Sequence, residues 1–120
     1  KVRRAKAIYA DPLEVAVVEV DAVNESGMAK VMGIEEGDFI LQYHSWNYFS
    51  NTREPIDSFI KELNAVGRKA KTIEFCRKGE GEFHFFKVDF PLGWLWIHMT
   101  DSAITKRQSE KMKQEYKNRS

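Results

Sequence analysis

The side chains that could carry out catalysis or bind a metal are few and lie far apart. The three histidines, His44, His84 and His98, form no pair within a helical turn, and Cys76 is the only cysteine. Transition-metal sites usually draw on histidine and cysteine pairs a few residues apart, so we expect no metal site. Cys76 lies in an apolar stretch, which is typical of a buried, unreactive thiol.

Motifs that support enzyme chemistry are also missing. The sequence contains no Gly-x-Ser-x-Gly nucleophile motif, no phosphate-binding loop and no dinucleotide-binding fingerprint. The neighbouring carboxylates Glu35 and Glu36 fall in a polar turn, where solvated charge is the expected state. We therefore predict that the protein is not an enzyme and that it uses no cofactor.

Charges are distributed unevenly along a chain whose net charge is only +1. The first ten residues carry four basic side chains and no acidic one, and residues 101–120 carry six basic side chains against three acidic ones. These ends largely lack interleaved aromatic residues, so we expect no nucleic-acid partner. No apolar run approaches the roughly 18 residues that a membrane span needs. The length predicts one domain, residues 1–100, followed by a charged helix or flexible tail, residues 101–120.

The clearest local pattern is the segment Gly33-Ile34-Glu35-Glu36-Gly37-Asp38-Phe39-Ile40. Gly33 is expected to end a short helix, because glycine takes the left-handed C-terminal position without strain. Asp38 is expected to bond nearby backbone N–H groups in the following turn. A strand then begins at Phe39.

The other expected elements follow from apolar periodicity and turn residues. Ile56, Phe59, Ile60 and Leu63 form one apolar stripe of a helix that begins near Pro55 and ends at Gly67. The tail stripe of Ile104, Met112 and Tyr116 is weaker, so that helix is expected either to dock on the body or to be partly disordered. The remaining expectations are strands at 7–9, 13–23, 39–44, 72–76, 82–90 and 94–99, helices at 28–32 and 102–117, a long loop at 44–51 and a hairpin turn at 77–81.

The order of these elements resembles the PDZ domain, in the circularly permuted bacterial form of high-temperature-requirement proteases, C-terminal processing peptidases and site-2 proteases. Four motifs carry the resemblance: Gly27–Ile34, Gly37-Asp38-Phe39-Ile40, the helix Ile56–Leu63 and Arg77-Lys78-Gly79. It implies an α+β fold, a small, partly open β-barrel or sandwich of five or six strands. One short helix, one longer helix and the C-terminal helical tail complete this expected fold.

The resemblance also implies a function, the binding of an extended peptide or a protein C-terminus by strand addition beside the helix at 55–66. The expected peptide-groove residues are Ile56, Ile60, Leu63, Trp94, Leu95 and Trp96. Spacing alone is equally compatible with core positions for the helix residues. Two segments are candidates for the loop that binds a terminal carboxylate: Leu92-Gly93-Trp94, or Ala5-Lys6-Ala7-Ile8.

The sequence departs from the family in ways that keep a second hypothesis open. Met28 stands where a proline is usual, a longer loop replaces the short Asn-Gly turn, and the early carboxylate loop lacks glycine. The alternative is a structural or assembly domain of PDZ topology without peptide binding, with a possible homo-oligomer through the aromatic last strand or the tail. The resemblance favours a regulatory domain of a protease-associated protein in the bacterial periplasm or cell envelope.

Overall fold

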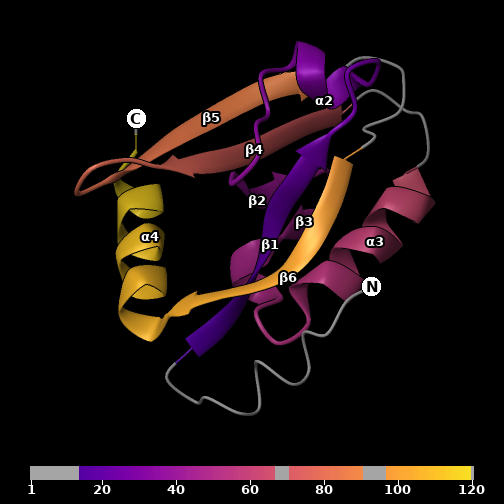
Figure 1. Cartoon of the computed structure of the whole chain (residues 1–120). Helices are drawn as coiled ribbons and strands as arrows, with labels where there is room; N and C mark the ends of the chain where they lie inside the picture. Colours follow the sequence, from indigo (N-terminus) through magenta and orange to yellow (C-terminus); the bar gives the residue numbers. More distant parts are fainter. Residues whose placement is uncertain (1–13, 67–70, 91–96, 120) are drawn as a thin grey trace.

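The centre of the structure is an antiparallel β-sheet, and the computed structural model describes residues 14–66, 71–90 and 97–119. Within these residues the strands lie in the order β5-β4-β2-β1-β6, and the short strand β3 pairs with β2. Figure 1 shows helix α4 at one side of the molecule and helix α3 at the other. The predicted α+β class is confirmed. In the described residues the sheet is open, because β5 and β6 do not pair with each other.

Strand β1 (Glu14–Val23) pairs with β6 (Ile97–Thr105), from Glu14 opposite Thr105 to Val23 opposite Ile97. The register shifts between Val20 and Ala22, so Asp21 forms a bulge. The predicted strand at 13–23 is thereby confirmed. Val17 and Val18 are both buried, so this strand is covered on both faces of the sheet at that point.

The predicted strand end at residue 99 and the predicted helix start at residue 102 were both wrong. Strand β6 continues to Thr105, so residues 102–105 belong to the sheet and not to the tail helix. Helix α4 (Lys106–Asn118) begins only after Thr105, whose side chain accepts a hydrogen bond from the Gln108 N–H. The Gln108 side chain accepts in return from the Thr105 N–H, which completes a capping box. Pairing with β1 thus outweighs the local helical pattern.

The Gly33 turn forms as its residues predict. Helix α2 (Met28–Val31) ends with hydrogen bonds from the Gly33 N–H to the Lys30 carbonyl and from the Ile34 N–H to the Ala29 carbonyl. These two bonds define a Schellman motif, which requires the positive φ of 87° at Gly33. Ile34 is consequently buried over the helix that it follows.

The loop predicted at 44–51 is instead a hairpin followed by a turn of 3₁₀-helix. Strand β2 (Phe39–Tyr43) pairs with β3 (Trp46–Asn47) across the two residues His44 and Ser45. His44 takes the left-handed φ of 54° that glycine or asparagine more often supplies in such turns. The 3₁₀-helix η1 (Tyr48–Ser50) follows, with the Asn47 side chain accepting from the Phe49 N–H.

Helix α3 (Pro55–Val66) begins at proline, as predicted, because the first helical position needs no N–H donor. Its residues Ile56 and Phe59 are buried in the core. The Phe59 ring lies 5.4 Å from the Tyr43 ring and 5.0 Å from the Trp46 ring, measured between centroids. These contacts hold α3 against the β2–β3 hairpin. The predicted helix end at Gly67 lies outside the described residues.

Strands β4 (Lys71–Lys78) and β5 (Phe83–Phe90) form the predicted hairpin, with Lys78 opposite Phe83. Its turn needs glycine twice. Gly81 has a φ of 81°, and a Cβ on Gly79 would lie 2.5 Å from the His84 ring. The predicted strand at 7–9 and the residues Trp94 to Trp96 of the predicted last strand lie outside the described residues.

Helix α4 is docked on the body, which settles the two expectations for the tail. Met112 is fully buried in the core, and its sulfur lies 3.6 Å from the Cys76 sulfur. The Phe83 N–H donates to the Glu115 carboxylate at 2.8 Å, and the Tyr116 hydroxyl donates to Glu74 at 2.8 Å. The buried Met112 side chain and these two hydrogen bonds between α4 and the sheet therefore fix a helix whose outer face is polar.

Candidate functional site

Strand β6 forms one edge of the sheet and offers backbone groups for a further strand. It pairs with β1 along one side, and no strand of the described chain pairs with its other side, here called the outer edge of β6. An unpaired edge presents a row of N–H and C=O groups that an extended peptide can use. The outer edge of β6 is therefore one place where this fold could accept a peptide strand.

The opposite edge, on β5, is less open to such pairing. Helix α4 lies against this strand, where Glu115 accepts a hydrogen bond from the Phe83 N–H. The exposed positions of β5 include Lys87 and Asp89, and charged residues discourage the addition of another strand. Of the two edges in the described sheet, β6 is the better candidate.

The predicted groove residues of α3 fall into different environments. Ile56 is 1% exposed and lies in the core, so its position matches the core alternative. Leu63 is partly buried against the core. Ile60 is 38% exposed and is the position of α3 where a large apolar side chain faces solvent. The structure thus separates the stripe: Ile56 and Phe59 lie inside, and Ile60 lies outside.

Helix α3 packs against β1 and the short strand β3, and β1 lies between β2 and β6 in the sheet. The remaining predicted groove residues, Trp94, Leu95 and Trp96, lie outside the described residues, as do both candidate carboxylate loops, 92–94 and 5–8. The sequence places residues 92–94 a few positions before β6 begins at Ile97.

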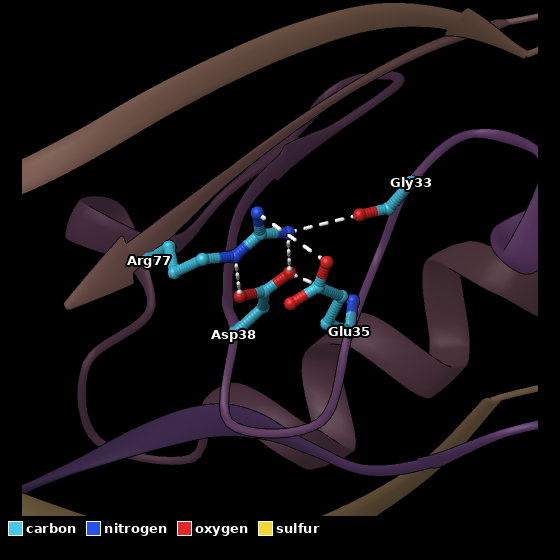
Figure 2. A network of polar contacts seen from close by, with 4 residues as sticks. All are labelled: Gly33, Glu35, Asp38 and Arg77. Carbon is cyan, nitrogen blue, oxygen red and sulfur yellow. Dashed lines mark hydrogen bonds and ion pairs between the residues drawn. The ribbon is translucent and has the colours of Figure 1, made fainter. Parts of the chain in front are cut away.

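The Gly33–Ile40 turn is fixed by an ion pair that sequence reasoning missed (Figure 2). Arg77 donates from Nε to Asp38 Oδ1 at 2.8 Å and from Nη2 to Asp38 Oδ2 at 2.9 Å. The same Nη2 donates to the Gly33 carbonyl at 2.9 Å, and the Glu35 N–H donates to Asp38 Oδ2 at 2.8 Å. Asp38 is fully buried, and its hydrogen bonds raise the pKa of Arg77 further above its ordinary value.

This network is a structural clamp. It joins the end of α2 to strand β4, and the Arg77 guanidinium lies 4.8 Å from the centre of the Phe86 ring. Both carboxylate oxygens of Asp38 accept hydrogen bonds from within the protein, and Arg77 Nη1 lies 3.7 Å from a Glu35 carboxylate oxygen, which leaves little capacity for a ligand. The available sequence signals were Gly37-Asp38 and Arg77-Lys78-Gly79, each noted as a motif but not as partners.

His44, Ser45 and Glu62 come together between the β2–β3 hairpin and α3, but they do not form a nucleophile and its base. His44 Nδ1 donates to Glu62 Oε2 at 2.7 Å, and the Ser45 hydroxyl donates to the same oxygen at 2.9 Å. The hydroxyl therefore faces the carboxylate and not the imidazole that would have to take its proton. The bonds from His44, followed by those from Ser45, lower the pKa of Glu62.

The other chemically notable groups are also occupied or buried. Burial in the core raises the pKa of the Cys76 thiol, which keeps it protonated and unreactive. A hollow of about 570 Å³ beside the end of α4 includes Glu74, Lys87 and Arg119. Glu74 already accepts from Tyr116 and Arg119 at its base. The Glu74 contacts were a second network that sequence reasoning missed, and no local motif marks it.

The described part of the chain contains neither a metal-ligand cluster nor a membrane-spanning helix. There, no group of three or more histidine, cysteine or carboxylate side chains is placed to hold a metal ion. No helix within the same residues has the length and apolar character needed to cross a bilayer. No protein-family model matches the chain, and no curated protein matches it in sequence.

Proposed function

We propose that this protein is a peptide-binding domain that accepts an extended segment, or a protein C-terminus, as an additional strand on the outer edge of β6. The observation that carries the proposal is the position of β6 at the edge of the sheet. From Ile97 to Thr105 it pairs with β1 on one side, and on the other side no strand of the described chain pairs with it. The resemblance to PDZ domains implies the same mode of binding, the addition of a peptide strand to a sheet.

The energetics of such binding would come from two sources. Backbone hydrogen bonds to the β6 edge would supply affinity without regard to peptide sequence, and side-chain contacts would supply selectivity. Ile60 offers an apolar contact on α3. Its side chain is exposed to water in the free protein, and an apolar side chain of a bound peptide would remove that apolar surface from water. A peptide with an apolar residue opposite α3 is therefore the preferred ligand.

A library of peptides with free C-termini tests this proposal. The protein is titrated with fluorescent library members, and binding is followed by anisotropy. We expect selection of sequences with apolar residues near the C-terminus. If no peptide binds at concentrations up to the millimolar range, the proposed function is wrong.

A pair of matched variants locates the site. Ile60→Glu introduces a charge at the exposed apolar position of α3 that the proposed peptide would contact. It is expected to weaken binding at least tenfold while the protein stays folded, because this side chain is exposed. Val31→Glu makes the same change on α2, where Val31 is 76% exposed, and is expected to leave binding unchanged. Equal losses for both variants, or none for Ile60→Glu, would place the peptide elsewhere. Circular dichroism confirms that both variants fold.

One observation favours the second candidate function, a structural or assembly domain. Because Ile56 is buried, α3 contributes a smaller exposed apolar surface than its stripe predicts. In this alternative the outer edge of β6 pairs with the same edge of a second copy. Light scattering over a range of concentrations separates the two: a monomer at all concentrations that binds peptide supports the first candidate, and a stable dimer that binds none supports the second.

A further inference from the structure

Strand β6 is followed directly by a pair of cations at the start of α4. Thr105 ends the strand, and the next two residues, Lys106 and Arg107, form the start of the helix. Both side chains are exposed. Neither forms an ion pair with a carboxylate in the part of the chain that the structure describes. Two acidic residues lie close to them in the fold or along the chain: Glu14, opposite Thr105 in the ladder, and Glu110, one helical turn further on.

Lys106 and Arg107 do not stabilise the helix to which they belong. The first turn of a helix favours acidic side chains because of the helix dipole, and cations there are unfavourable. The first turn of α4 contains no acidic residue. Its start is already stabilised by the capping box between Thr105 and Gln108. Lys106 and Arg107 are therefore available for a contact outside the described chain.

The direction of strand addition decides what these cations would meet. All strand pairs of the described sheet are antiparallel, and antiparallel pairing is slightly the more stable kind. A peptide added antiparallel to β6 places its C-terminal part near Ile97 and its N-terminal part near Thr105. Eight residue steps separate these ends, roughly 26 Å at about 3.3 Å per residue.

We infer that the ligand is a peptide with acidic residues upstream of its docked segment, about eight to ten positions before the residue that pairs with Ile97. At that distance the peptide leaves the edge of β6 and passes Lys106 and Arg107. Glutamate or aspartate side chains there meet two unpaired cations. This inference rests on the proposed function, and it adds the charge pattern of the ligand to it.

The test uses one core peptide, the tightest binder from the free C-terminus library, in two extended forms. One form carries three glutamates at the upstream positions, and the other carries glycine and serine. Exposed ion pairs each contribute up to about fivefold in affinity, so we expect the glutamate form to bind about three- to tenfold more tightly at low salt. The difference should shrink towards onefold in 1 M salt, where screening is short-ranged.

Two double variants, each of which removes two positive charges, show which cations cause the preference for the glutamate form. Lys106→Ser with Arg107→Ser should abolish the preference for the glutamate form and leave the affinity for the neutral form unchanged. Lys113→Ser with Lys117→Ser removes two exposed cations further along α4 and should preserve the preference.

The outcomes separate this inference from the proposed function. Equal affinity for both extended forms, while the core peptide still binds, overturns the acidic preference alone. An equal loss in both double variants also overturns it, since that result shows general attraction to a basic helix. If no core peptide binds, the proposed function fails and this inference fails with it.

Discussion

Replacing Asp38 by alanine tests the clamp that holds the Gly33–Ile40 turn against β4. The buried carboxylate accepts two hydrogen bonds from Arg77 and one from the Glu35 N–H, all within 2.9 Å. Hydrogen bonds to charged groups contribute about 1.5–3 kcal/mol each, but the Arg77 side chain is 32% exposed and can regain water in the variant. We therefore expect a loss of about 3 kcal/mol in the free energy of unfolding, at the low end of the range for breaking a buried pair.

Urea unfolding followed by tryptophan fluorescence measures this loss. The expected result is a lower midpoint with an unchanged slope, because the native contacts elsewhere are retained. Lys30→Ala is the control: its exposed pair with Glu25, at 3.7 Å, should contribute less than about 0.5 kcal/mol. A loss below about 1 kcal/mol for Asp38→Ala, with the slope unchanged, would refute the reasoning that this pair stabilises the turn.

Two further predictions concern α4 and the β2–β3 hairpin. Met112→Ala is expected to lower the free energy of unfolding by about 2–4 kcal/mol, because Met112 is the fully buried side chain that anchors α4. Amide exchange in α4 should also become faster. Unchanged exchange would contradict this role. Glu62→Gln is expected to lower stability most above pH 4.5, the ordinary pKa of the group. Because the pKa of Glu62 is lowered in the folded state, its stabilisation is lost as pH falls through that lower pKa. The difference in urea midpoint between the variant and the parent protein should therefore narrow at low pH. A difference that does not depend on pH would contradict the prediction.

The elements that could be predicted from the sequence are those with strong local signals. Gly33 and its neighbours specify a helix end through backbone conformation alone, so the Schellman motif was predictable. Pro55 and the apolar stripe likewise predicted α3. The two-residue turn at His44 was not predictable, because histidine seldom takes a left-handed φ and this one is held by the distant Glu62.

Tertiary contacts decided the elements that the sequence did not predict. Residues 102–105 read as helix, but β1 offers them a strand partner, and Thr105 then caps the helix that begins after it. For the candidate site, periodicity placed Ile56 and Ile60 on one stripe without showing which of them is exposed. That difference depends on how α3 packs against β1 and the hairpin.

Amide exchange along β6 tests the central proposal most directly. In an antiparallel edge strand, alternate N–H groups bond to the neighbour and the others point outward. Within Ile97–Thr105, the amides that face β1 should already be protected in the free protein, and the outward amides should exchange quickly. Saturation with the tightest library peptide is expected to protect those outward amides. If the peptide is bound and they still exchange at their free rates, strand addition at the outer edge of β6 is contradicted.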